Sequence, residues 1–478
     1  MPGPELSRRS LLVGGLAVAG ATALPASPAG AAPSAVPAAT LAGRALGDAF
    51  TLGVASGDPS PDGVVLWTRL APEPLAADGR GGMPSRPVTV QWEVAEDDRF
   101  RRLVQRGRTV ARPETGHSVH VELTGLRPGR EYSYRFRVEG QVSPAGRTRT
   151  APRVGSNPAS LSMAFASCAQ YEHGYFTAYR RLAEEEPELV LHLGDYQYEY
   201  IANAYVAPGE GGNVRDHAGP ETTDLAGYRQ RHAQYKTDLD LQAAHAVAPW
   251  LVVFDDHEVE NNWADDVPEE PQEGFAARRA AAFQAYYENM PLRRSAIPRG
   301  PDIQVYRTIQ WGRLASFHMM DTRQYRSDQA CGDGTRVDCA ERLDPARTIT
   351  GAEQETWLLD GLAASQARWD VLGQQVFFAQ RDTRAGEVEA FSMDGWDGYA
   401  ASRQRIIDGF VQGRVRNPVV LTGDVHRHYA NDITVDPADP ASRPVGTELV
   451  CSSITSGGDG SDTTEATDVQ LAENKTMR

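Results

Sequence analysis

Three short polar segments, each directly after an apolar run, carry the residue types of this chain that could bind metal ions. They are residues 194–198 (Gly-Asp-Tyr-Gln-Tyr), 255–258 (Asp-Asp-His-Glu) and 423–426 (Gly-Asp-Val-His). The apolar runs have the length of buried strands, and open α/β sheets keep their sites at the C-terminal ends of strands. Metal-ligating side chains at three such ends predict two or more metal ions held side by side. A site of that kind hydrolyses phosphate esters.

The first segment offers a carboxylate and a phenol three residues apart, Asp195 and Tyr198. We expect Asp195 to bridge two cations and Tyr198 to bind one of them as a phenolate. The free pKa of a phenol is ~10, so a strong Lewis acid is needed to remove its proton near neutral pH. Fe(III) meets that demand, whereas oxygen-preferring Ca(II) or Mg(II) alone meet it poorly. The alternative is that Asp195 caps a turn and Tyr198 packs at the rim.

Cys168 follows another strand-like run and could be a thiolate ligand or a nucleophile. Its alternatives are a small core residue or a disulfide with Cys451, which also follows a strand-like run.

The second segment is dense in ligand-type side chains and continues into two asparagines. We expect Asp256 to coordinate a metal and His257 to donate a proton or to hydrogen-bond a developing charge. Asn261 or Asn262 could offer a neutral oxygen to a Ca(II)-like ion. The alternative is a capped helix start with acidic residues in its first turn.

The third segment pairs a carboxylate and an imidazole, Asp424 and His426, at positions i and i+2. On an extended strand end both side chains point to one face, which suits one ligand for each of two metals. His428 lies two residues further on, where it could support a ligand or could be a surface histidine.

The N-terminus has the pattern of an export signal. Paired arginines, Arg8 and Arg9, precede a mild Gly/Ala/Val/Leu run over 13–24, and small residues offer cleavage near Ala31. Residues 1–32 are therefore predicted to be a twin-arginine (Tat) signal, with a plain Sec signal as the alternative. We expect a disordered lead-in over 33–49 and a secreted or cell-wall-associated mature protein. No other stretch is long and apolar enough to span a bilayer.

Composition and charge indicate a soluble globular protein of two or three units. The chain has 478 residues, 41% hydrophobic and 23% charged, with a net charge of −16. The acidic balance argues against nucleic acid as a partner, because binding a phosphate backbone needs basic patches. An anionic substrate would then depend on bound cations. Cys331 and Cys339 bracket a Gly/Asp-rich loop and are predicted to form a disulfide, as suits an exported protein.

The chain divides into an all-β part and an α/β part. Residues 88–94 and 117–123 alternate in polarity, and several Gly/Pro turns predict a β-sandwich over 50–151 resembling fibronectin type III or immunoglobulin domains. Residues 152–158 are a polar linker. From 159 to 478, strand-like and helical runs alternate, which is typical of an α/β domain.

Together these motifs resemble the PhoD type of alkaline phosphatase, a metallophosphoesterase related to the purple acid phosphatases. The similarity extends to residues 50–70, 280–293 and 321–326 and so covers most of the chain after the leader. It implies a sandwich of two mixed sheets flanked by helices. Family members usually continue with further β structure beyond residue 478, so we expect that this copy is C-terminally truncated.

The resemblance also implies a ligand set. Fe(III) would be held by Cys168, Asp195, Tyr198 and His426, and Ca(II) by Asp195, Asp256 and Asp424, with Asn262 nearby. Gln374 or Gln375 falls where purple acid phosphatases place a histidine ligand, and Gln375 is our candidate for the harder ion. Arg278 or Arg279, or else Arg293, is the candidate phosphate clamp, because a guanidinium matches phosphate oxygens bidentately.

The function expected from this sequence is a Tat-exported alkaline phosphatase that hydrolyses phosphate monoesters and diesters with an Fe(III)/Ca(II) cluster. His257 would assist the leaving oxygen. One alternative is a phosphodiesterase or phospholipase D-like enzyme acting on lipids or teichoic acids. Another is a non-catalytic cell-wall protein, and a third is a di-zinc or Fe–Zn phosphatase, which Cys168, Tyr198 and the scarcity of histidine ligands disfavour.

Overall fold

The computed structural model describes residues 46–457, apart from residues 208–210, 385 and 440. The predicted export signal and most of the predicted lead-in therefore lie outside the described residues, as does the chain after residue 457. None of the helices in the described ranges is long and apolar enough to cross a membrane.

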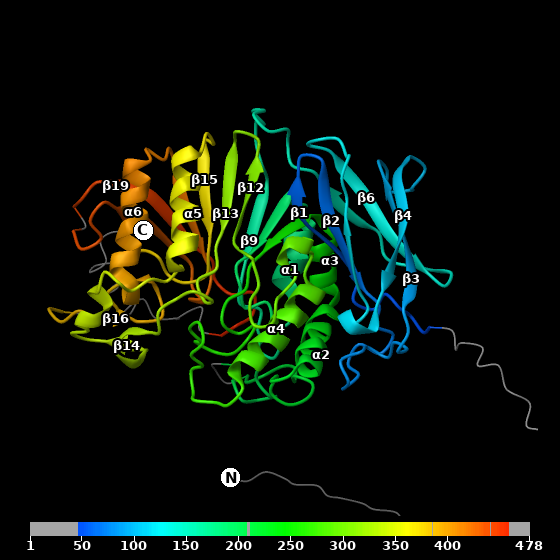
Figure 1. Cartoon of the computed structure of the whole chain (residues 1–478), viewed down its shortest axis with the longest axis horizontal. Helices are drawn as coiled ribbons and strands as arrows, with labels where there is room; N and C mark the ends of the chain where they lie inside the picture. Colours follow the sequence, from blue (N-terminus) through cyan, green and yellow to red (C-terminus); the bar gives the residue numbers. More distant parts are fainter. Residues whose placement is uncertain (1–45, 208–210, 385, 440, 458–478) are drawn as a thin grey trace, which may run out of the picture. The chain divides into compact units, whose positions relative to one another are not determined.

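Two six-stranded mixed sheets form the centre of the fold (Figure 1). In the first sheet β9, β10 and β11 run parallel, and β1 extends it by pairing parallel to β11. In the second sheet β13, β15, β17 and β19 run parallel, between antiparallel edge strands. In order across the first sheet, the strands are β5 (Ser118–Glu122), β2 (Gly63–Arg69), β1 (Val54–Ser60), β11 (Pro249–Val252), β10 (Leu189–His192) and β9 (Met163–Ala166). In order across the second sheet, they are β12 (Arg307–Trp311), β13 (Ala315–Met319), β15 (Trp369–Gly373), β17 (Pro418–Thr422), β19 (Pro444–Val450) and β18 (Tyr429–Thr434).

The two sheets pack against one another through apolar side chains, and helices cover their outer faces. Leu191 of the first sheet and Phe317 and Leu421 of the second belong to one buried cluster between the sheets. Strands buried on both faces read as continuous apolar runs, which is why these segments were visible in the sequence. The helices are α1 (Thr177–Glu184), α2 (Leu225–Lys236), α3 (Leu239–Val247) and α4 (Phe275–Asn289) on the first sheet, and α5 (Gly351–Ala364) and α6 (Ala400–Gln412) on the second (Figure 1).

A third sheet of five strands contains the alternating segment 88–94, whereas the segment 117–123 lies at β5 in the first sheet. In β3, Val88 and Val90 are buried while Thr89 and Gln91 are exposed, as the predicted period of two requires. The buried face packs on β2 and β5, so one wall of this sandwich is an extension of the first sheet. Its strands are β3 (Val88–Ala95), β4 (Leu103–Ala111), β6 (Glu131–Val138), β7 (Gln141–Val142) and β8 (Gly146–Arg149).

The predicted Cys331–Cys339 disulfide is present. The loop that it closes contains β14 (Thr335–Arg336), which pairs with β16 (Phe391–Ser392). Cys168 and Cys451 are free, so the alternative of a disulfide between them is not realised. The remaining elements are short 3-10 helices, namely η1 (Pro113–Thr115), η2 (Arg294–Ala296), η3 (Ala330–Gly332), η4 (Ala340–Leu343) and η5 (Trp396–Tyr399).

Candidate metal centre

The candidate ligands lie where parallel strands of the two sheets end. Cys168 follows β9, Asp195 follows β10, Asp256 follows β11 and Asp424 follows β17. Three of them have left-handed backbone conformations, with φ of 60° at Cys168, 53° at Asp195 and 58° at Asp424, and His426 has a φ of 58°. Such conformations are uncommon outside glycine and gather at functional sites. The sharp turns aim these side chains back across the ends of the sheets.

The first ligand group combines a thiol, a carboxylate and an imidazole. Ligand atoms of Cys168, Asp195 and His426 all lie within 4.8 Å of one another. The Tyr198 hydroxyl lies 3.0 Å from Asp195 Oδ2 and 3.4 Å from His426 Nε2, and it accepts a hydrogen bond from Ser456 Oγ at 2.7 Å. The structure therefore brings together all four residues expected to hold Fe(III).

The buried acidic groups of this site would be stabilised by a bound cation. Burial, with the charge of Asp195 adding to it, raises the pKa of both the Cys168 thiol and the Tyr198 phenol well above their ordinary values. Asp195 Oδ1 and Asp256 Oδ1 are enclosed and have no hydrogen-bond partner among the described residues. Enclosed carboxylate oxygens without partners are costly unless a cation neutralises them. The donor set of thiolate, phenolate, imidazole and carboxylate fits a trivalent iron ion.

The second ligand group shares Asp195 with the first. Ligand atoms of Asp195, Asp256 and His257 lie within 4.8 Å of one another. Burial raises the pKa of Asp424 to about 7, and the nearby charges of Asp394 and Asp256 act in the same direction. A divalent ion with a preference for oxygen would relieve this repulsion.

His257, a member of the second group, is held in a fixed orientation by Glu199. Its Nδ1 lies 2.9 Å from Glu199 Oε2, and its ring lies over that of Tyr198 with the centroids 4.1 Å apart. Burial alone would lower the pKa of His257, but the charges of Asp256, Glu199 and Asp195 hold it well above its ordinary value. The protonated ring is the form that a general acid needs. Glu199 lies one residue after Tyr198, and the sequence analysis did not identify it.

A second carboxylate that the sequence analysis missed ties two of the turns together. Glu258 accepts backbone N–H bonds from Asp195 at 3.0 Å, Tyr196 at 2.6 Å and Asp255 at 2.9 Å. The turn also requires glycine at position 194, because a Cβ there would lie 2.4 Å from Asp255 Cβ. The sequence contained a signal for this role of Glu258. Glu258 lies three residues after Asp255, which is the spacing at which a carboxylate caps a backbone N–H.

Arg323, which the sequence analysis did not name, lies beside the candidate metal ligands. Its fully buried guanidinium donates to Asp255 Oδ1 at 2.6 Å and to both oxygens of Asp394 at 2.8 and 2.9 Å. It also lies 3.7 Å from Asp256 Oδ1. Arg323 belongs to the segment 321–326 that carried part of the family resemblance, which is the one signal that could have identified it.

The guanidiniums of the predicted phosphate clamps are engaged by other groups of the protein. Arg278 donates to Glu260 at 2.7 Å and to Glu221 at 2.8 Å. Arg279 lies 3.2 Å from Asp266. Both side chains are almost fully buried, and carboxylates hold both guanidiniums. Arg293, the third candidate, donates to a backbone carbonyl of β1 at 2.6 Å.

Gln375 also differs from its prediction as a metal ligand. Its amide oxygen accepts from the Thr322 backbone N–H at 3.1 Å and hydroxyl at 2.7 Å, and its amide nitrogen donates to Met320 O at 3.0 Å. Both lone pairs of the oxygen are therefore used. The Gln374 amide oxygen accepts from Trp396 Nε1 at 3.0 Å. Both glutamines join strands of the second sheet instead of facing an ion.

The two asparagine candidates are separated by the fold. The Asn261 side chain points to the surface and donates to Glu269 Oε1 at 2.7 Å. The Asn262 backbone N–H donates to Asp256 Oδ2 at 2.8 Å, so Asn262 lies directly beside the second ligand group. His428 is exposed, and its Nδ1 accepts from the backbone of Ser452 at 3.1 Å.

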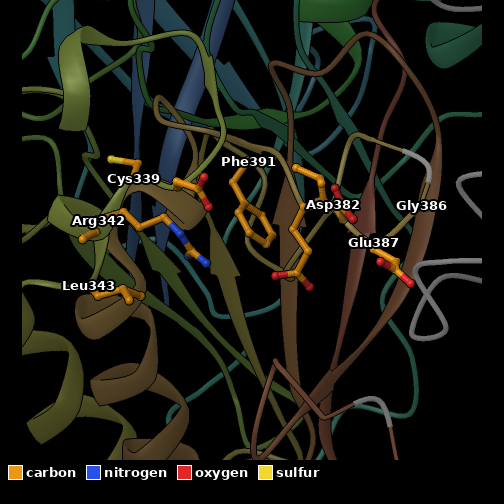
Figure 2. Close-up of a pocket in the computed structure, with 11 residues that line it drawn as sticks. Cys339, Arg342, Leu343, Asp382, Gly386, Glu387 and Phe391 are labelled. Carbon is orange, nitrogen blue, oxygen red and sulfur yellow. The ribbon is translucent and has the colours of Figure 1, made fainter.

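A groove of about 890 Å³ lies beside the disulfide loop (Figure 2). Arg342 lies over the ring of Phe391, 4.0 Å from its centroid. None of the candidate metal ligands lines this groove, and its charged residues are mainly acidic, including Asp382 and Glu387. It therefore does not extend the phosphate-binding region.

Comparisons with known proteins agree with this geometry. Residues 163–478 match the family model described as PhoD-like phosphatase, and residues 35–152 match that of the PhoD-like phosphatase N-terminal domain. The chain is 53% identical over 427 residues to alkaline phosphatase D of Bacillus subtilis (strain 168), which covers 89% of this chain and 72% of that protein. A solved structure described as "Structure of PhoD" matches with a TM-score of 0.88 at 51% identity, covering 91% of this chain and 83% of that one. The chain therefore belongs to the PhoD-like phosphatase family and is a phosphoric ester hydrolase of the alkaline phosphatase D type.

Proposed function

We propose that this phosphatase hydrolyses phosphate monoesters and diesters with an Fe(III)/Ca(II) pair bridged by Asp195. The observation that carries the proposal is the division of the ligands into two chemically different groups. One group contains a thiol, a phenol and an imidazole, which suit Fe(III), and the other is dominated by carboxylates, which suit Ca(II). Cys168, Tyr198 and His426 would hold iron, and Asp256 and Asp424, with Asn262 beside them, would hold calcium.

The bound ions would supply Lewis acidity toward the phosphoryl oxygens, which the net charge of the chain alone could not offer. The protein's own part is to donate a proton and to hold its donors in place. Glu199 accepts from His257 Nδ1, which leaves Nε2 as the nitrogen that can deliver a proton to the leaving oxygen. Glu258 and Arg323 fix the turns that carry Asp195 and Asp256.

The test is hydrolysis of a nitrophenyl phosphomonoester beside its diester, after EDTA treatment and again after Ca(II) is added back. We expect activity to be lost and then restored by Ca(II), and the ratio of the two rates gives the ester preference. Asp195→Asn is expected to lose most activity and metal, because both ions would share this carboxylate. No hydrolysis of either ester by folded, metal-loaded protein, or unchanged turnover in Asp195→Asn, would contradict the proposal.

A second candidate, a phosphodiesterase or phospholipase D-like enzyme acting on lipids or teichoic acids, is favoured by one observation. The segment after Tyr198 exposes apolar side chains, with Ile201 49% and Val206 53% exposed. The ring of Tyr200, in the same segment, lies edge-on to that of His257, with centroids 5.4 Å apart. A phosphodiester with an apolar group that stays on the phosphate, as in a phosphatidyl ester, would contact this segment. If so, rates on short-chain phosphatidyl esters should exceed those on glycerophosphodiesters with the same head group.

We further propose that the protein is exported by the Tat translocase and acts outside the cell or at the cell wall. The support is the Arg8-Arg9 pair before an apolar run, in a part of the chain outside the described residues. Replacement of Arg8 and Arg9 by lysine should block export and leave the protein in the cells. Normal secretion of that variant would reject the Tat assignment.

A further inference from the structure

The loop closed by the Cys331–Cys339 disulfide carries one carboxylate to the edge of the metal centre. Asp333 Oδ2 accepts a hydrogen bond of 2.8 Å from the Asn262 side-chain amide. The backbone N–H of the same Asn262 donates to Asp256 Oδ2 at 2.8 Å. Asn262 thus connects the disulfide loop to a candidate calcium ligand through two hydrogen bonds at opposite ends of one residue.

The bond to Asp333 determines the orientation of the Asn262 side-chain amide. An asparagine amide has an NH2 group that donates and an oxygen that accepts, and the hydrogen-bond network decides its orientation. A carboxylate can only accept, so Asp333 holds the NH2 group and turns Oδ1 to the opposite side. Within the described ranges no donor reaches Asn262 Oδ1. Ca(II) binds amide oxygens and not amide nitrogens, so this orientation is the one that an ion beside Asp256 requires.

The neighbouring backbone is held from the same side. Asn262 has a left-handed backbone with a φ of 48°, and its carbonyl accepts from Gln329 Nε2 at 2.6 Å. Gln329 lies just before the disulfide loop, so one segment binds both the side chain and the backbone of Asn262. These bonds compensate for a conformation that asparagine adopts less readily than glycine.

The loop is held by a small apolar cluster and by backbone pairing. Ala330 and Cys339 pack with Phe391 and Met393, and β14 pairs with β16. Cys331 is exposed, and Asp333 itself has a left-handed backbone with a φ of 59°. The disulfide closes the loop over a sequence separation of 8 residues. The Arg336 guanidinium bonds back to the carbonyls of Asp333 at 2.6 Å and Gly332 at 2.7 Å. The covalent cross-link is therefore one of several restraints on the position of Asp333.

We propose that Asp333 is a positioning residue for the calcium half of the metal centre, and that the Cys331–Cys339 disulfide keeps it in place. Asp333 orients the Asn262 amide so that Oδ1 faces the ion beside Asp256. The inference rests on the proposed function, because it assumes that this half binds Ca(II). Removal of a residue that hydrogen-bonds to a metal ligand and orients it weakens metal binding by about 10–100-fold.

The test compares two glycine substitutions in the same loop. Asp333→Gly removes the carboxylate without backbone strain, because glycine adopts positive φ freely. Asp338→Gly is the matched control, since Asp338 is an exposed carboxylate of the same loop with a φ of 56°. Calcium affinity is measured by competition with a fluorescent chelator on iron-loaded full-length protein. We expect Asp333→Gly to bind Ca(II) about tenfold more weakly, Asp338→Gly to match the wild type, and Asp333→Asn, which keeps an acceptor oxygen, to recover part of the loss.

Equal calcium affinity in Asp333→Gly and wild type would overturn the inference. So would an equal loss in both glycine variants, which would mean that the loop had only been loosened. Cys331→Ser/Cys339→Ser should weaken calcium binding in the same direction, with the iron content unchanged, and wild-type affinity there would remove the disulfide from the proposal. If the wild-type chain hydrolyses esters but binds no Ca(II), the calcium assignment of the proposed function fails together with this inference. If the wild-type chain binds Ca(II) and substitution of Asp333 leaves the affinity unchanged, only this inference fails and the proposed function stands.

Discussion

Asp195 belongs to both ligand groups, and its two carboxylate oxygens have different surroundings. Oδ2 accepts from the Tyr198 hydroxyl at 3.0 Å, whereas Oδ1 is enclosed without a partner in the described part of the chain. Glu258 holds the backbone amide of Asp195 at 3.0 Å, so the side chain projects from a fixed turn. A carboxylate that is to be shared by two cations must be held in one orientation, and the bond to Glu258 does this for Asp195.

The prediction at the residue scale concerns the phenol of Tyr198. If this side chain binds Fe(III), the iron-loaded protein should absorb visible light through phenolate-to-iron charge transfer. Tyr198→Phe should shift or abolish this band, because the phenylalanine ring has no oxygen to donate. The band is recorded by absorption spectroscopy, with iron content measured in parallel.

Tyr200→Phe is the matched control for that experiment. Its ring lies 6.5 Å from that of Tyr198, in the same segment, but it is not part of either ligand group. We expect its spectrum to match that of the wild type. A colourless and iron-free protein with full activity would contradict the iron assignment.

At the scale of elements, the N-terminal strands are part of the sheet that carries three of the ligand turns, those of Cys168, Asp195 and Asp256. β1 pairs with β11, with Gly57 opposite Trp250, and a Cβ at Gly57 would lie 2.7 Å from the Trp250 carbonyl oxygen. The Trp67 indole of β2 donates to Glu288 O of α4 at 2.9 Å. The strand that precedes Asp256 therefore has a hydrogen-bonded neighbour from the first hundred residues of the chain.

We therefore expect the α/β part to depend on the N-terminal strands. A chain of residues 159–478 would expose the edge of β11 and the apolar side chains that face β1 and β2. It should be insoluble or should unfold without cooperativity, as circular dichroism during a urea titration would show. The control is a chain of residues 46–478, which retains every described strand. A soluble 159–478 chain that unfolds cooperatively would contradict this dependence.

At the scale of the whole molecule, the core contains histidines that are neutral in the folded state. His192 is 1% exposed, and its Nε2 lies 2.9 Å from the Tyr179 hydroxyl. Burial and the nearby charge of Lys236 lower the pKa of His192 to about 3, from an ordinary value of 6.5. Burial also lowers the pKa of His232 and His245 well below that value.

These shifts predict that the folded protein loses stability in acid. Between pH 6.5 and about 3, the unfolded chain binds a proton at position 192 that the folded chain does not. The free energy of unfolding therefore falls as the pH drops through this range, by at most about 1.4 kcal/mol per pH unit for one proton. In urea titrations between pH 7 and pH 5, His192→Gln should show a shallower pH dependence than the wild type. The exposed His428→Gln serves as a control, and identical slopes for wild type and His192→Gln would contradict the prediction.

The sequence by itself located the strand ends and the polar side chains that follow them. Buried parallel strands are continuous apolar runs, and the polar residues after Leu193 and after Leu421 interrupt them abruptly, so the strand ends and their side chains could be located without coordinates. The Cys331–Cys339 pair was equally local, because both cysteines lie in one short loop. These features depend on neighbours within a few residues.

Only the tertiary structure decided which charged groups face the metals and which face one another. The charge pattern of α4 did not reveal that carboxylates from other segments hold Arg278 and Arg279. The residues next to Arg323 in the sequence did not distinguish it from those two arginines. Gln375 has the right residue type, but its amide oxygen accepts from Thr322, in the segment after β13. Asp333 meets Asn262 across 71 residues. A hydrogen bond or ion pair joins whichever groups the fold brings within about 3 Å, and sequence spacing does not encode that distance when the partners lie on different elements.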